Sequence, residues 1–157
     1  MKTAEKRTKM NKCYALFPII ITLDQAIKSR VDAVMEPGQS IPVIRDVFHL
    51  SYVQNTGAAF SFMKGHTELI TIFTGILLAA LLVYLLGWAR EKSGFFTCSL
   101  LLIVGGGAGN LIDRVARGYV VDMFDFRFWP VFNVADIAIC VGCAMLVIYL
   151  LILDRAK

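Results

Sequence analysis

The chain has 157 residues, of which 57% are hydrophobic and 18% are charged. This composition is too apolar for an ordinary soluble domain, and the length suits a single domain. The net charge of +4 is small, and the basic residues are distributed according to their position between the apolar segments. The charge therefore does not indicate nucleic-acid binding. We therefore expect one membrane domain over residues 1–157.

Four apolar segments predict four transmembrane helices, at about residues 13–30, 67–88, 94–112 and 131–153. The second and fourth are long enough to cross a hydrocarbon core of about 30 Å. The first is short and contains Asp24, and the third is rich in glycine. Two long spans with two buried or re-entrant segments is therefore the alternative. The expected fold class is an all-α membrane protein.

Charged residues flank these segments unevenly. The regions before the first, between the second and third, and after the fourth contain nine basic and three acidic residues, a net charge of +6. The rest of the chain contains seven basic and nine acidic residues, a net charge of −2. Because cytoplasmic loops are enriched in Lys and Arg, this pattern places both termini in the cytoplasm. The N-terminal segment resembles a secretory signal, but charged residues occupy the expected cleavage position, so we interpret it as a retained anchor.

The outer connection, at about residues 31–66, is too long for a structureless loop. Val, Ile, Phe and Tyr are frequent from Ile41 to Val53, which favours strands, and Pro42 favours an edge position. We expect a small extracytoplasmic β-sheet between the first and second helices, resting on the membrane surface. The following Asn55–Ser61 segment suits either a close approach to a peptide backbone or a plain turn.

Small residues within the apolar segments indicate helix packing. Gly105 and Gly109 have the small-xxx-small spacing that lets membrane helices approach closely. The C-x-x-C spacing near the C-terminus lacks a second pair or a histidine cluster that would complete a zinc site. We interpret this pair as packing residues and expect no disulfide framework from the four cysteines of the chain, Cys13, Cys98, Cys140 and Cys143.

Polar residues gather at the outer ends of the third and fourth segments: Asn110, Asp113, Arg114, Asp122, Asn133 and Asp136. Ionisable residues at the rim of the lipid are costly, so they indicate a functional site. If the two segments pack antiparallel, Asp122 and Asp136 can meet at the outer boundary. Two close carboxylates share a proton, so that one can accept a proton from water while the other polarises a carbonyl group.

Other polar residues have alternative interpretations. Asp24 and Lys28 share a helix face and can form an ion pair. Arg114 can bind Asp113 or another carboxylate through two parallel hydrogen bonds. The aspartates could also be helix caps, proton or cation carriers of a small transporter, or interface groups of a structural membrane subunit. Their position at one face and the lack of an internal repeat disfavour the transporter.

Five short motifs, taken together, resemble those of the lipoprotein signal peptidase family, also called signal peptidase II. They occur in the family's order and on its four-span layout, and they cover nearly the whole chain. The motifs are DQ-x-x-K (Asp24–Lys28), NTGAAFS (Asn55–Ser61), GN-x-x-DR (Gly109–Arg114), VVD (Val120–Asp122) and FN-x-AD (Phe132–Asp136).

The resemblance implies an aspartic endopeptidase of the bacterial cytoplasmic (inner) membrane with its site at the extracytoplasmic face. Such enzymes remove the signal peptide of diacylglyceryl-modified prolipoproteins and cut just before the lipidated Cys. The implied catalytic dyad is Asp122 and Asp136. The implied supporting residues are Asp24, Lys28, Asn55, Asn110, Asp113, Arg114 and Asn133.

The resemblance also implies a monomer that contacts membrane lipids and needs no metal or organic cofactor. Inhibition by globomycin-type peptide antibiotics is expected for the same reason. One departure is the link between Asp122 and Asp136, which is shorter than in many members of the family. We expect Trp129-Pro130 to form a rigid turn within it.

Overall fold

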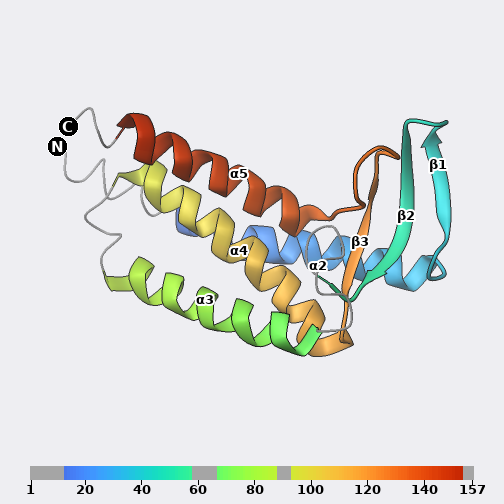
Figure 1. Cartoon of the computed structure of the whole chain (residues 1–157), viewed down its shortest axis with the longest axis horizontal. Coiled ribbons are helices and arrows are strands. Elements are labelled where there is room, and N and C mark those ends of the chain that lie inside the picture. The colour runs from blue at the N-terminus through green and yellow to red at the C-terminus, as the bar shows by residue number, and fades with distance from the viewer. Residues whose placement is uncertain (1–12, 58–66, 88–92, 154–157) are drawn as a thin grey trace.

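The computed structural model of the chain describes residues 13–57, 67–87 and 93–153. The helices run side by side, and a sheet lies across one end of them (Figure 1). The helices are α2 (Leu16–Val34), α3 (Thr67–Gly87), α4 (Gly94–Arg117) and α5 (Val134–Ile148), which continues into the π-helical turn η3 (Tyr149–Leu153). The strands are β1 (Ser40–Ile44), β2 (Phe48–Asn55) and β3 (Val120–Asp125). The protein is therefore mostly helical, with one small sheet.

Some of the sequence-based interpretation lies outside the described residues. The basic segments that assigned the cytoplasmic side fall at residues 1–12, 88–92 and 154–157. Residues 58–61 of the NTGAAFS motif are likewise not described.

Within the described residues, three helices are long and apolar enough to cross a membrane. They are α3, α4, and α5 together with η3. Helix α2 has 19 residues but carries four charged side chains, at Asp24, Lys28, Arg30 and Asp32, so composition alone does not mark it as a span. The three apolar helices identify a membrane protein, and the count of four spans stays a prediction.

Helix α4 lies at the centre of the bundle and contacts α2, α3 and α5. Glycines make these contacts close. A methyl group at Gly106 would lie 2.4 Å from the carbonyl oxygen of Ala135, and one at Gly109 would lie 2.6 Å from Asp24 Oδ2. The predicted close packing is thus confirmed at Gly109, whereas Gly105 has only an ordinary contact of 3.5 Å with helix α2.

The sheet is antiparallel, with strand order β1-β2-β3. The prediction of sheet structure over Ile41–Val53 is confirmed, since β1 and β2 form an antiparallel hairpin there, and Pro42 lies in the edge strand β1 as expected. The expectation that the whole sheet lies between the first two membrane helices is wrong, because β3 follows α4. Strand β3 is buried along most of its length and packs with α2 through Val31, Met35 and Met123. Asp122 therefore lies within a paired strand that fixes its backbone.

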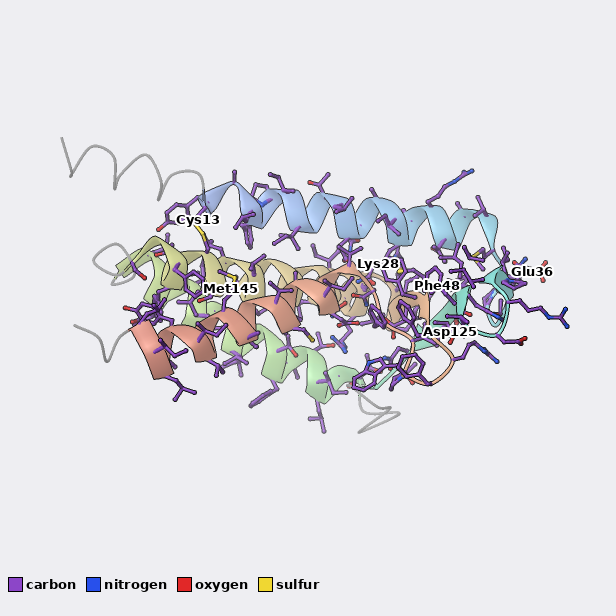
Figure 2. The ribbon with its side chains drawn as sticks, turned by 90° about the horizontal axis from the view of Figure 1, so that it is seen from above. Cys13, Lys28, Glu36, Phe48, Asp125 and Met145 are labelled. Carbon is purple, nitrogen blue, oxygen red and sulfur yellow. A yellow bond between two sulfur atoms is a disulfide. The ribbon has the colours of Figure 1, made fainter. Side chains whose placement is uncertain are left out.

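The expectation of no disulfide is also corrected. Cys13 and Cys98 form a disulfide, with a Cα–Cα distance of 5.2 Å. Cys13 lies at the end of the molecule opposite the sheet (Figure 2). The pair is 85 residues apart in the chain, and only the packing of α2 against α4 brings it together, so sequence spacing could not show it. Cys140 and Cys143 are free and exposed on α5, so their expected role as packing residues is wrong.

Candidate active site

Asp122 is held between two asparagine side chains. It is 2% exposed, and its carboxylate accepts hydrogen bonds from Asn133 Nδ2 at 2.6 Å and Asn55 Nδ2 at 2.9 Å. Asn55 lies on β2, opposite Val120, and side chains two positions apart across a strand pair share a face of the sheet. The sheet register therefore delivers Asn55 to Asp122.

Asp136 is held by the start of α5. Asn133 is the N-cap residue and accepts a hydrogen bond from Asp136 N, while Asp136 Oδ2 accepts one from Asn133 N at 3.2 Å. This reciprocal capping box satisfies two backbone donors of the first helical turn. The other carboxylate oxygen, Oδ1, accepts from Asn110 Nδ2 at 2.8 Å. The rotamer of Asp136 is thus fixed from two sides.

The link between the two aspartates folds back onto β3. The carbonyl oxygen of Phe132 accepts hydrogen bonds from Met123 N and Phe124 N, and Phe124 and Phe132 form a bridge. This return places Asn133 directly beside Asp122, although the intervening link is short. As a result, Asn133 contacts both predicted catalytic aspartates.

Burial, followed by the negative charge of Asp136, raises the pKa of Asp122 to about 7 from an ordinary value of 3.8. Hydrogen bonds from Asn55 and Asn133, which favour the ionised form, offset part of this rise. A carboxyl group with this pKa holds its proton near neutral pH and can donate it. The site therefore contains one carboxyl group, that of Asp122, which keeps its proton to an unusually high pH.

A buried ion cluster lies behind the two aspartates, at the sheet end of the helices where Figure 2 labels Lys28. The predicted pair of Asp24 and Lys28 is confirmed, with Lys28 Nζ 2.9 Å from Asp24 Oδ2. Lys28 Nζ also lies 3.0 Å from Asp113 Oδ2 and donates to Asn110 Oδ1 at 2.9 Å. The side chains of Asp24 and Lys28 are 0% exposed, and that of Asp113 is 1% exposed.

Arg114 does not pair with Asp113, which we had offered as one possibility. Asp113 instead accepts from Arg117 Nη1 at 2.9 Å. Arg114 Nη2 donates to the carbonyl oxygen of Gly57 at 3.0 Å, and its buried Nε has no hydrogen-bond partner among the described residues. An unpaired buried donor lowers the stability of the fold. Because Nε has no partner among the described residues, it can donate a hydrogen bond to a carbonyl group bound next to it.

Two further residues, Gln25 and Arg117, take part in this network and were not predicted as site residues. Gln25 Nε2 donates to Asp113 Oδ1 and to the carbonyl oxygen of Gly109, each at 3.1 Å. Arg117 lies one helical turn after Asp113, and this i, i+4 spacing could have indicated the pair. Gln25 belongs to the DQ-x-x-K motif, but nothing in the sequence predicted its hydrogen bonds. Among the described residues, no three His, Cys, Asp or Glu side chains gather in a way that could hold a metal ion.

The fold and the site together define a membrane protein with a buried carboxylate centre at one end of its apolar helices. The model of the signal peptidase (SPase) II family matches residues 16–152. The chain belongs to this family and is therefore a protease.

The relatives and solved structures agree with this assignment. A lipoprotein signal peptidase of Halothermothrix orenii is 48% identical over 87% of this chain and 93% of its own length. One of Pelotomaculum thermopropionicum is 40% identical over 92% of this chain and 93% of its own length. A solved bacterial membrane enzyme, 29% identical, superposes with a TM-score of 0.82 over 90% of this chain and 88% of that chain.

Proposed function

We propose that this protein is an aspartic endopeptidase that removes the signal peptide from diacylglyceryl-modified prolipoproteins. The observation that carries the proposal is that Asn133 bonds Asp122 and Asp136 at once, inside a buried network. A shared asparagine holds two carboxyl groups in the proximity that paired acid and base catalysis requires. Membership of the signal peptidase II family supports the reaction class.

In the proposed reaction, water attacks the carbonyl carbon of the residue before the lipidated Cys. Asp136, ionised, takes a proton from that water, and protonated Asp122 donates its proton to the carbonyl oxygen. The tetrahedral intermediate then collapses: its hydroxyl group returns a proton to Asp122, and Asp136 gives its proton to the departing Cys nitrogen. The C–N bond breaks, a new C–O bond remains, and both aspartates regain their starting states.

The supporting residues have separate roles in this proposal. Asn55 orients Asp122, Asn110 orients Asp136, and the unpaired Nε of Arg114 binds a carbonyl group of the substrate backbone. The lipid chains of the substrate stay in the bilayer while the scissile bond reaches the sheet end of the helices. No metal or organic cofactor takes part.

The proposed setting is the bacterial cytoplasmic (inner) membrane. Four spans would place both termini in the cytoplasm and the sheet, with the site, at the extracytoplasmic face. We propose that the protein acts as a monomer and is inhibited by globomycin-type peptide antibiotics. Large hydrophobic side chains are exposed on α3, for example those of Phe73 and Ile76, and such a surface suits contact with lipid.

The test is cleavage of a diacylglyceryl-modified prolipoprotein by purified protein in detergent. Wild type should cut before the lipidated Cys, whereas Asp122→Asn and Asp136→Asn should fold but lose activity by at least about 100-fold. Asp125→Asn is the matched control, since Asp125 is also buried on β3 but bonds Ser51 and Arg127. Retained cleavage in either dyad variant would exclude the dyad, and no cleavage by folded wild type would exclude the peptidase.

A further inference from the structure

We propose that Asp24 and Asp113 are positioning residues, each of which holds the backbone immediately before one catalytic aspartate. This inference rests on the proposed function, because it assumes that Asp122 and Asp136 carry the reaction. It assigns a purpose to the buried ion cluster that the reaction itself does not use.

Asp113 holds the strand that carries Asp122. Asp113 Oδ2 accepts a hydrogen bond from Val121 N at 3.1 Å, and Val121 directly precedes Asp122. On its other edge, β3 is paired with β2. The strand segment before Asp122 is therefore bonded on both edges, once by the sheet and once by a carboxylate from α4.

Asp24 holds the helix that carries Asp136. Asp24 Oδ1 accepts a hydrogen bond from Ala135 N at 2.9 Å, and Ala135 directly precedes Asp136. The first turn of a helix has backbone donors without intrahelical partners. Asn133 satisfies the donor of Asp136, and Asp24, from a different helix 111 residues away in the chain, satisfies the donor of Ala135.

Lys28 joins the two holding carboxylates. Its ammonium group has three donors, and three acceptors surround it: Asp24 Oδ2 at 2.9 Å, Asp113 Oδ2 at 3.0 Å and Asn110 Oδ1 at 2.9 Å. With its Oδ1 engaged by Lys28, Asn110 directs Nδ2 to Asp136 at 2.8 Å. One buried cation thus fixes the relative position of both carboxylates and the amide that orients Asp136.

The expected purpose of this arrangement is to set the separation of the dyad. Two carboxyl groups share one proton only when they are held close, and a misplacement of about 1 Å can cost about 100-fold in rate. If either backbone segment were released, the dyad would open while the substrate-binding groups stayed in place. The effect should therefore fall on kcat and leave KM nearly unchanged.

The experiment compares two substitutions at each position, Asp113→Asn with Asp113→Leu and Asp24→Asn with Asp24→Leu. Both remove the same charge and have nearly the same shape, but only Asn keeps an oxygen that can accept from the backbone N–H. We expect kcat for prolipoprotein cleavage to fall less than about fivefold in the Asn variants and about 100-fold in the Leu variants, with KM within about threefold. Asp125→Asn and Asp125→Leu, on the same strand, are the controls and should cleave like wild type.

Equal losses in the Asn and Leu variants would show that charge alone matters and would overturn the proposal, as would wild-type kcat in the Leu variants.

If a Leu variant does not fold, the Val121 N–H is replaced by an ester oxygen during cell-free synthesis into nanodiscs. This change leaves all side chains intact and should lower kcat at least about tenfold, whereas an ester at Val47, whose N–H bonds the carbonyl oxygen of Ile44 in the turn of the β1-β2 hairpin, should not. An unchanged kcat for the Val121 ester would overturn the proposal. One result would refute this inference alone and leave the proposed function standing. In that result the wild type cleaves, Asp122→Asn does not, and the Leu variants of Asp24 and Asp113 cleave like wild type.

Discussion

Asn133 donates its side-chain amide to Asp122 at 2.6 Å while its side-chain oxygen accepts from the backbone of Asp136 at 2.9 Å. One side chain therefore caps a membrane helix and orients a buried carboxyl group on a strand. The two roles use different atoms, so they can be separated by substitution.

Asn133→Ser should keep the cap and lose the amide donor, because a hydroxyl group accepts from the first helical turn but cannot replace Nδ2 at Asp122. We expect a melting temperature close to that of wild type and a loss of about tenfold or more in prolipoprotein cleavage. Asn133→Ala loses both roles and should be less stable by about 1 kcal/mol as well. Thermal unfolding in detergent and cleavage kinetics measure the two effects, and wild-type kcat in the Ser variant would contradict this separation.

Asp122 should make stability depend on pH. Its pKa of about 7 in the folded protein lies above the ordinary value of 3.8, so the folded state binds the proton more tightly than the unfolded state. That stabilisation is complete below the ordinary pKa and is lost as pH rises through 7, at a cost of up to about 4 kcal/mol. Asp122→Asn, which cannot ionise, should therefore raise the melting temperature more at pH 8 than at pH 5.

Asp125 supplies a control of opposite sign for this pH dependence. Burial acts to raise the pKa of Asp125, but hydrogen bonds from Arg127 and Ser51 outweigh it and lower the pKa overall. The ionised form therefore stabilises the fold above the ordinary pKa, and Asp125→Asn should lower the melting temperature at both pH 5 and pH 8. A gain in stability at pH 8 for both variants would point to a general charge effect and contradict the assignment to Asp122.

Gly106→Ala should disrupt the contact between α4 and α5. The added methyl group would lie 2.4 Å from the carbonyl oxygen of Ala135, and backbone cannot move aside as a side chain can. We expect a loss of about 1–3 kcal/mol, together with reduced cleavage, because Ala135 precedes Asp136. Gly75→Ala is the matched control: its methyl group would contact nothing within 4 Å, and alanine favours the helix. A stable and active Gly106→Ala variant would show that the two helices are less closely packed than described.

The membrane orientation can be tested by labelling single cysteines in a variant that lacks the four native ones. Arg45→Cys, at the exposed tip of the β1-β2 hairpin, should react with an impermeant maleimide added to intact spheroplasts. Lys92→Cys, in the predicted cytoplasmic connection, should react only after the membrane is permeabilised. Labelling of Lys92→Cys from outside would overturn the predicted orientation, and with it the placement of the site.

Local spacing was enough to predict part of the site. The i, i+4 spacing predicted the Asp24–Lys28 pair, and the β-branched and aromatic residues of Ile41–Val53 predicted that this segment forms part of a sheet. The rest depended on contacts between distant segments. Val120–Asp125 is a short apolar run that periodicity alone does not mark as a strand, and its pairing with β2 exists only because α4 returns the chain to the sheet. The choice of Lys28 rather than Arg114 as the partner of Asp113 depends in the same way on how α2 packs against α4.

The site is assembled from segments at opposite ends of the chain: Ala135 N bonds Asp24 across 111 residues, and β3 closes a sheet begun before α3. A nascent chain emerging from the ribosome therefore has no complete site until α5 reaches the membrane. The order of synthesis itself would keep this protease inactive until its own insertion is nearly finished.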